Sequence, residues 1–134
     1  KVKGFLEASE KMLGEENEKL VLNTDLENVE KDLCNLVTKE AIDCIIAIDE
    51  EASFASLRVA KKLEKNIPKD LAIVGYMSEK VAEYLDIPFT TINQHRKKMG
   101  QEVMNLILQK LDPSSNDSIQ KINIKSTLIR RKSF

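Results

Sequence analysis

Apolar residues recur along the chain in runs that switch between helical and strand-like spacing. Those within 5–13 repeat at helical intervals, and the run stops at Gly14, a usual residue at a helix end. Residues 20–22 form a short apolar run of strand type, and Thr24 with Glu27 three positions later resembles a capping box that opens a second helix. The apolar stripe of that helix is Leu26, Val29, Leu33, Leu36 and Val37.

The central part of the chain predicts two buried strands with a helix between them. Residues 44–48 are continuously apolar and rich in Ile, which suits a strand buried on both faces of a parallel sheet. Apolar positions in 52–66 have helical spacing, and Pro68 stops this helix. Residues 71–76 then form the next buried strand.

The last third of the chain predicts further alternation of helix and strand. Ser78 is placed to cap a short helix through Leu85, and 89–92 is β-branched enough for a strand. Residues 99–111 form an amphipathic helix, and 112–118 read as a polar surface loop. A half-exposed strand near a sheet edge follows, with its even spacing at Ile122, Ile124 and Leu128.

Strands that alternate with helices predict an α/β fold. Such units form a parallel sheet with right-handed crossovers, here as a three-layer αβα arrangement. A chain of 134 residues is one folding unit. Because a helix opens the chain with no strand before it, we expect an incomplete domain.

Charge and hydropathy exclude two classes of partner for this segment alone. Its 21 Lys and Arg residues against 22 Asp and Glu residues give no strong field for a phosphate backbone, and 130–132 reads as a solvated tail. No apolar run approaches the length of about 20 residues needed to span a bilayer, and 1–4 lacks the features of a signal peptide. We expect a cytoplasmic chain without direct membrane or DNA contacts.

The residues that carry catalysis and metal binding are sparse. His95 is the single histidine and lies in a basic stretch, while Cys34 and Cys44 sit in apolar segments typical of a core. One histidine and two separated cysteines give no tetrahedral metal spacing. The four glycines form no phosphate loop. We therefore expect no enzymatic activity, no metal and no cofactor.

In an open α/β sheet, ligands bind at the loops that leave the carboxyl ends of the strands. These loops are predicted to begin at Asn23, Asp49, Met77 and Asn93. Asp49 has two interpretations. It caps the helix that follows, or it presents a carboxylate to ligand hydroxyl groups in a cleft.

Several motifs, taken in order, resemble the C-terminal half of the LacI-family regulator domain, a type I periplasmic-binding-protein-like fold. Residues 1–5 are similar to its Arg-x-x-Gly-Phe helix entry, and 47–50 to its Ala-Asn-Asp turn. Residues 68–76 resemble the Pro-x-Asp-hydrophobic-Val-Gly-Tyr signature. Residues 88–94, followed by Met99-Gly100, resemble the Pro-Leu-Thr-Thr-Ile-x-Gln and Met-Gly segment.

This resemblance implies an effector cleft lined by Lys1, Asp49 and Met77, with Gln94 at the hinge crossing between two lobes. Two positions depart from the family pattern. Lys1 replaces an arginine and loses its bidentate fork, and Met77 replaces a carboxylate that commonly binds ligand hydroxyls. The alternative for Met77 is ordinary gap-filling at the end of a strand.

The resemblance also implies a homodimer, with Ser53, Phe54 and Leu85 at the contact between subunits. Burial in the core is the alternative for Phe54. The implied domain boundaries are a C-terminal subdomain at 1–87, a segment that crosses to a missing N-terminal lobe at 88–118, and a returning strand and tail at 119–134.

The implied function is that of a transcriptional repressor fragment. A small effector, usually a sugar in this family, would shift the two lobes and bias a helix-turn-helix DNA-binding domain that is absent from this chain. Two rivals stay open: a periplasmic or membrane-anchored sugar receptor with the same fold, and a small flavodoxin-like enzyme. The absent phosphate loop and catalytic cluster count against the enzyme.

Overall fold

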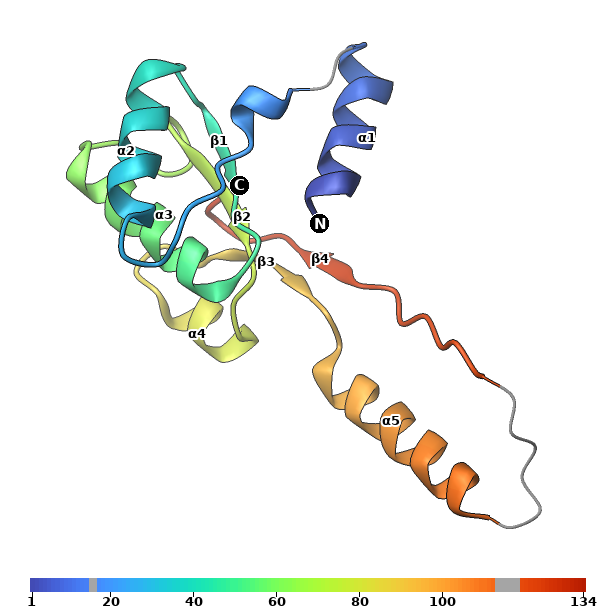
Figure 1. Ribbon diagram of the computed structural model, residues 1–134. Coiled ribbons are helices and arrows are strands. Elements are labelled where there is room, and N and C mark those ends of the chain that lie inside the picture. The colour runs from blue at the N-terminus through green and yellow to red at the C-terminus, as the bar shows by residue number, and fades with distance from the viewer. Residues whose placement is uncertain (15–16, 113–118) are drawn as a thin grey trace.

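The computed structural model describes residues 1–14, 17–112 and 119–134, along which helices and strands alternate (Figure 1). The helices are α1 (Val2–Leu13), the 3-10 helix η1 (Glu18–Leu20), α2 (Val29–Lys39), α3 (Glu50–Lys62), α4 (Glu79–Tyr84) and α5 (Arg96–Leu111). The strands are β1 (Cys44–Ile46), β2 (Ala72–Gly75), β3 (Thr90–Asn93) and β4 (Thr127–Ile129). Apart from Asp112, the predicted loop at 112–118 lies outside the described residues.

The strands form one sheet in the order β1-β2-β3-β4. β1, β2 and β3 are parallel, with Ile45 opposite Ile73 and Val74 opposite Thr90. β4 is antiparallel to β3 and pairs Ile92 with Leu128. The predicted α/β class with a mainly parallel sheet is therefore confirmed.

Helices α2 and α3 lie on one side of the sheet, and α1 stands on the other side in Figure 1. The core forms between the sheet and α3, where Ala55, Val59 and Ala60 have no exposed surface. Small residues on this helix allow it to approach β2 closely. The other buried apolar residues of the core are Leu33, Val37, Ile45, Ala47, Leu71, Ile73, Val74, Met77, Ala82 and Phe89.

Two predicted helix ends are confirmed in detail. Gly14 adopts the left-handed conformation at φ 77°, and its N–H donates to the carbonyl of Glu10 at 2.9 Å. Ser78 caps α4, because its Oγ accepts a hydrogen bond from the N–H of Val81 at 3.4 Å.

The strand predicted at 20–22 is wrong. Leu20 ends the 3-10 helix η1, and the chain then runs without a ladder partner while Leu22 packs against the core. The capping box is also wrong, because α2 begins at Val29 and Thr24 Oγ1 instead donates to Asp32 Oδ2 at 2.6 Å. Leu26 precedes the helix and is 72% exposed. Burial of the apolar run, without a neighbouring strand, explains the strand-like pattern.

β1 is shorter and more exposed than the sequence predicts. It ends at Ile46 and pairs only with β2, so it forms an edge of the sheet. Ile45 is buried, whereas Ile46, whose side chain points to the opposite face of the sheet, is 55% exposed. The continuous apolar run therefore predicted a strand correctly but predicted burial on both faces wrongly.

The carboxyl-terminal strand is confined to Thr127–Ile129, and Ile122 and Ile124 lie outside it. The basic segment that follows is anchored, which corrects its prediction as a solvated tail. Arg131 N–H donates to Thr90 Oγ1 at 2.8 Å, and Arg131 Nη1 donates to the carbonyl of Phe89 at 3.0 Å.

Ser133 completes this anchor between β2 and β3. Its side chain is fully buried, and its Oγ donates to the carbonyl of Ile73 at 2.7 Å and accepts from Thr90 N–H at 2.8 Å. Ile73 N–H in turn donates to the Ser133 carbonyl at 2.7 Å. Ser133 therefore satisfies backbone groups of two strands at once.

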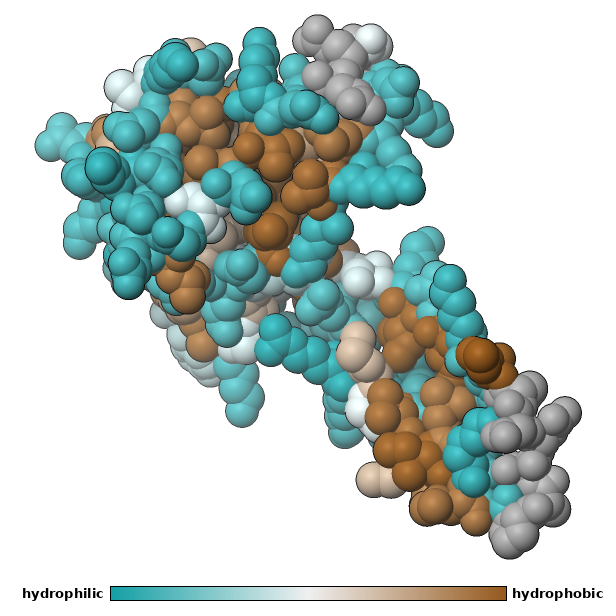
Figure 2. Space-filling view, viewed as in Figure 1, coloured by the Kyte–Doolittle hydropathy of each residue, from teal (hydrophilic) through white to brown (hydrophobic). Residues whose placement is uncertain are grey.

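α5 and residues 119–126 form an arm that extends away from the sheet (Figure 1). No residue of α5 is buried, and Figure 2 shows apolar side chains gathered along the arm. The exposed apolar residues of α5, here called the α5 stripe, are Met99, Val103, Met104, Ile107, Leu108 and Leu111. Across the described ranges, no helix has the length and apolar character required to cross a bilayer.

Candidate functional site

The carboxyl ends of β1, β2 and β3 lie at one edge of the sheet, because these strands are parallel. Asp49 follows β1, Tyr76 and Met77 follow β2, and Gln94 follows β3. The topology therefore brings three of the predicted effector residues to the same edge. Lys1 joins them from the start of α1.

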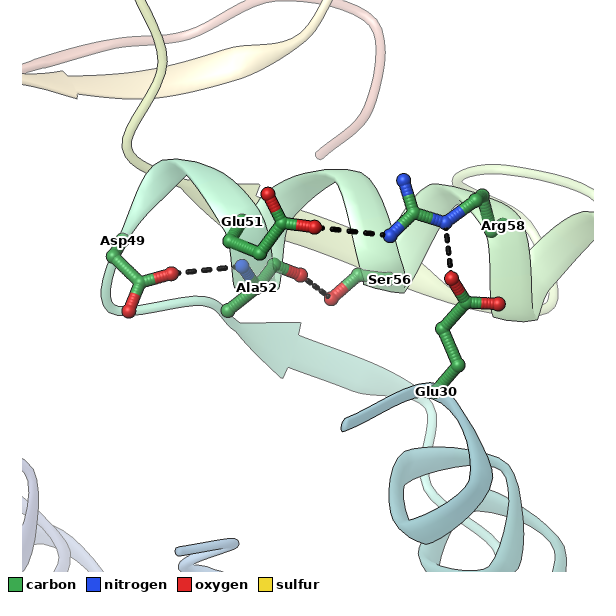
Figure 3. A network of polar contacts seen from close by, with 6 residues as sticks. All are labelled: Glu30, Asp49, Glu51, Ala52, Ser56 and Arg58. Atoms are coloured by element: carbon green, nitrogen blue, oxygen red, sulfur yellow. Dashed lines mark hydrogen bonds and ion pairs between the residues drawn. The ribbon is translucent and has the colours of Figure 1, made fainter. Parts of the chain in front are cut away.

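Asp49 is the N-cap of α3. Its backbone is extended, and its Oδ1 accepts a hydrogen bond from Ala52 N–H at 2.7 Å (Figure 3). The capping interpretation is thus confirmed. The side chain is exposed, and Figure 3 shows the other carboxylate oxygen turned away from the helix. Its role as an acceptor for an effector stays a prediction.

Lys1 is held at the strand tips by two contacts within the chain. Its Nζ lies 4.0 Å from the centroid of the Tyr76 ring, a cation–π contact, and donates to the carbonyl of Ile48. Lys1 therefore places a positive charge beside the turn that carries Asp49. The sequence analysis did not predict Tyr76 as a site residue. Its position gave a signal, because it is an aromatic residue directly after the buried strand that ends at Gly75.

Ser53 fastens α3 to the tip of β2. Its Oγ donates to the carbonyl of Asp49 at 2.7 Å and accepts from Tyr76 N–H at 3.1 Å. Ser53 is fully buried within this chain, so its side chain has no surface for a partner subunit. This corrects its prediction as an interface residue. The interface prediction then depends on Phe54 and Leu85.

Met77 packs in the core and is 6% exposed. Its N–H donates to Thr91 Oγ1 at 3.0 Å, which ties the end of β2 to β3. This position fits the gap-filling alternative for Met77, and contact with an effector stays a prediction. Gln94 is half-buried where the chain leaves β3 for the arm, and its role also stays a prediction.

The two remaining interface predictions lie on separate helices. Phe54 on α3 and Leu85 after α4 are half-buried, and both pack against the core. Leu85 also lines a hollow of about 400 Å³ together with Lys80, Val81 and Tyr84. Tyr84 is 84% exposed, so the rim of this hollow carries an aromatic side chain in water.

The titratable groups do not form a reactive cluster among the described residues. Burial raises the pKa of the Cys44 thiol, with the negative charge of Asp43 as the smaller cause, so this cysteine is held in its unreactive thiol form. Within 1–14, 17–112 and 119–134, no group of three His, Cys, Asp or Glu residues is arranged to hold a metal ion.

Residues 2–134 match the sequence family described as "Periplasmic binding protein-like domain". The chain belongs to the periplasmic binding protein-like domain family. Curated relatives of the chain are helix-turn-helix transcriptional regulators. Together with the family match, they confirm the resemblance to the effector-binding domain of LacI-family regulators.

One such relative is the HTH-type transcriptional regulator CelR of Thermobifida fusca. It is 28% identical over 89 residues, which cover 66% of this chain and 26% of CelR. The periplasmic binding protein-like domain described here thus spans about a quarter of that relative's length. This relative is a transcriptional regulator.

Solved structures of regulators share the fold. A transcriptional regulator CelR–cellobiose complex has a TM-score of 0.83 at 23% identity, over 99% of this chain and 41% of that chain. A LacI-type transcription regulator from Bifidobacterium animalis subsp. lactis has a TM-score of 0.79 at 20% identity, over 98% of this chain and 48% of that chain. The periplasmic binding protein-like fold is therefore secure over nearly the whole chain.

Proposed function

We propose that this chain is the ligand-sensing part of a transcriptional repressor, which binds a small effector and controls DNA binding through a separate helix-turn-helix domain. The observation that carries the proposal is the gathering of Lys1, Asp49 and Tyr76 at the carboxyl edge of the parallel strands. This edge is where α/β sheets bind small ligands. The relative CelR is a helix-turn-helix transcriptional regulator, which supports the link to DNA.

The chemistry of this edge suits a neutral molecule with several hydroxyl groups, such as a sugar. The Asp49 carboxylate accepts hydrogen bonds from hydroxyls, and the Lys1 ammonium donates to ring or hydroxyl oxygens. The Tyr76 ring holds the Lys1 ammonium at this edge through their cation–π contact. The solved CelR structure is a complex with cellobiose, a sugar of this chemical class.

The proposed action is allosteric and non-enzymatic. The site offers hydrogen bonds and charge but no nucleophile paired with a base, so we propose binding without turnover, with no cofactor. The proposed boundaries are a sensing subdomain at 1–87, a crossing segment at 88–118 and a return at 119–134. A regulator of this kind acts where its DNA lies, in the cytoplasm.

The test is a thermal-shift measurement on the intact regulator with cellobiose, D-ribose, D-glucose and adenine as probes. A probe that binds the folded state raises the melting temperature in proportion to the logarithm of its concentration. We expect one of these probes to stabilise the protein. Asp49→Asn should keep the helix cap, because Asn caps as well as Asp, while it weakens binding by about ten- to a hundredfold through the loss of a charge-assisted hydrogen bond.

Glu51→Gln is the matched control for this experiment. Glu51 lies two residues further along α3, and its carboxylate pairs with Arg58 at 3.3 Å, away from the strand tips. Its removal should leave the probe response unchanged. An equal response in the wild type and in Asp49→Asn would exclude Asp49 from the effector site.

We also propose a homodimer that forms through Phe54 and the hollow at Leu85. The exposed Tyr84 and Val81 at the rim are apolar side chains that a partner subunit would cover. Sedimentation velocity checks this proposal. Tyr84→Ser with Val81→Asp should convert the dimer to monomer, whereas Glu83→Gln on the same helix should not, and a dimer that survives the double substitution contradicts the proposed surface.

A further inference from the structure

A chain of polar side chains crosses the junction between the sheet and the arm, here called the neck. The neck consists of Asn93 at the end of β3, His95 at the start of α5, and Thr127 at the start of β4. Asn93 and Thr127 are register partners in the antiparallel pair. Because the chain leaves the sheet through β3 and re-enters through β4, the neck fixes how the arm leaves the sheet.

Three side-chain contacts connect the neck to α4. His95 Nε2 and Thr127 Oγ1 are hydrogen-bonded at 3.1 Å, and His95 N–H donates to Asn93 Oδ1 at 2.7 Å. Asn93 Nδ2 donates in turn to Glu79 Oε1. A continuous series of hydrogen bonds therefore runs from the first residue of α4, across β3, to the first residue of β4.

The backbone at the centre of this series is strained. His95 has φ 51° and ψ 48°, the left-handed region that residues with a Cβ rarely occupy. Such a conformation persists when surrounding contacts hold it in place. The contacts of His95 with Asn93 and Thr127 are two such restraints, and α5 begins at the next residue. A relaxed backbone at His95 would redirect the whole helix.

The same strand connects the neck to the tip of β2. Thr91 lies two residues before Asn93, so both side chains are on one face of β3. Thr91 Oγ1 accepts from Met77 N–H at 3.0 Å, and Asn93 binds Glu79. The segment from Met77 to Glu79, where α4 begins, is therefore held to β3 at two points. A displacement of that segment would pull directly on Asn93.

We propose that Glu79, Asn93, His95 and Thr127 form a latch that sets the orientation of the arm relative to the sheet. The latch works by holding His95 in its strained conformation. Loss of one link frees the turn to occupy ordinary backbone conformations, and the arm then samples other directions. This inference concerns the chain itself and stands whether or not a small molecule binds at the strand tips.

The distance between two spin labels tests the latch. One label is placed at Lys61→Cys on α3 and the other at Gln109→Cys on α5, in a background with Cys34→Ala and Cys44→Ala. Both labelled positions are exposed. Thr127→Val keeps the branched shape of the side chain but removes the hydroxyl. We expect the population of arm orientations outside the main distance peak to rise about two- to tenfold, the effect of one lost hydrogen bond.

Thr38→Val is the matched control, because Thr38 Oγ1 donates to the carbonyl of Cys34 at 2.7 Å within α2, away from the neck. It should leave the distance distribution unchanged. His95→Phe is a second latch variant. Phe keeps the bulk of the ring and does not favour the left-handed conformation, but it lacks the nitrogen that bonds to Thr127. It should broaden the distribution as Thr127→Val does.

The double variant decides whether the two residues act through one contact. If they do, the distribution of His95→Phe with Thr127→Val is no broader than that of His95→Phe alone. Additive broadening would show that the residues act independently and would overturn the latch. So would a distribution that stays unchanged in both single variants.

Discussion

Ser133 shows how much one small polar side chain contributes when it is fully buried. It links the carbonyl of Ile73 and the N–H of Thr90, which belong to neighbouring strands at the start of their pairing, where Val74 lies opposite Thr90. Sequence reasoning treated the neighbouring basic residues as a solvated tail. A serine beside charged residues carries no local signal of burial, because its partners are remote in sequence.

Ser133→Ala should destabilise the protein by about 1–3 kcal/mol, because it leaves a buried carbonyl and a buried N–H without their partner. Urea unfolding followed by circular dichroism measures this change. Ser126→Ala is the control, since Ser126 is exposed and its substitution should change the free energy of unfolding by less than about 0.5 kcal/mol. Equal midpoints for the two variants would contradict the role of Ser133.

Gly75 permits the close approach of α3 to β2. A Cβ at this position would lie 2.3 Å from Ser53 Oγ, closer than Cβ atoms approach in folded proteins, and 3.0 Å from the Cβ of Ala47, a tight contact. Gly75→Ala should therefore destabilise the fold by about 1–3 kcal/mol through overpacking. Gly100→Ala, with open space around its Cβ on α5, should stabilise it by up to about 1 kcal/mol. Thermal unfolding of both variants measures the opposite signs.

At the scale of elements, local patterns predicted where helices and strands form better than where they are buried. α3, α4 and the three parallel strands follow from apolar spacing, from Ser78 as a cap and from Pro68 as a stop. The run at 20–22 failed because its burial comes from packing without a strand partner. The site was found only in part. Asp49 follows from its place after a strand, whereas Tyr76 and the burial of Ser53 depend on contacts across the sheet.

α2 and α3 are joined at their surface by Arg58, which pairs with Glu30 of α2 and with Glu51 of its own helix (Figure 3). The side chain of Arg58 is 48% exposed, so water and salt screen both pairs. Glu30→Gln should cost about 0.2–1 kcal/mol at low salt and less in 1 M NaCl. Urea unfolding at both salt concentrations checks this. A loss that is larger, or that salt does not reduce, would contradict a screened ion pair.

The loop that connects α3 to β2 is held by Asp70. Its Oδ2 accepts from the backbone N–H of Asn66 at 2.9 Å and from Asn66 Nδ2 at 2.6 Å, and the backbone hydrogen bond is the largest cause that lowers the pKa of this carboxyl group. Because the folded state favours the ionised form, this stabilisation is present above about pH 4 and is lost as the pH falls through the lowered pKa.

The expected pKa of Asp70, measured by NMR titration, lies below that of an unstructured aspartate. Asn66→Ala removes the amide donor but keeps the backbone donor, so it should raise this pKa only in part. An Asp70 pKa at or above the unstructured value would contradict the assigned hydrogen bonds.

At the scale of the whole molecule, one run of the exposed apolar surface lies along the arm. The six residues of the α5 stripe are each at least 45% exposed, whereas the apolar residues between the sheet and α3 are buried. A contiguous apolar surface of this kind marks a contact surface. The isolated 134-residue chain should therefore bind a dye such as anilinonaphthalene sulfonate while folded. Ile107→Lys with Leu108→Glu should reduce that fluorescence strongly.

The control for this experiment is the pair Glu83→Gln and Lys61→Gln, which changes charges on the body of the molecule and leaves the α5 stripe intact. Dye fluorescence should not change in this control. Fluorescence that is absent in the wild-type chain, or that persists in the Ile107 and Leu108 variant, would show that the stripe is not the apolar surface in solution.

The anchor at Ser133 also bears on the order of folding. The hydrogen bond from Ser133 to Ile73 spans 60 residues of sequence, far more than the contacts within any helix of the chain. The entropy of closing so long a loop must be lost before the contact returns any free energy. We therefore expect the helices and the parallel strands to form first, and Ser133 to insert between β2 and β3 in one of the last steps. Ser133→Ala should then accelerate unfolding and leave the folding rate almost unchanged.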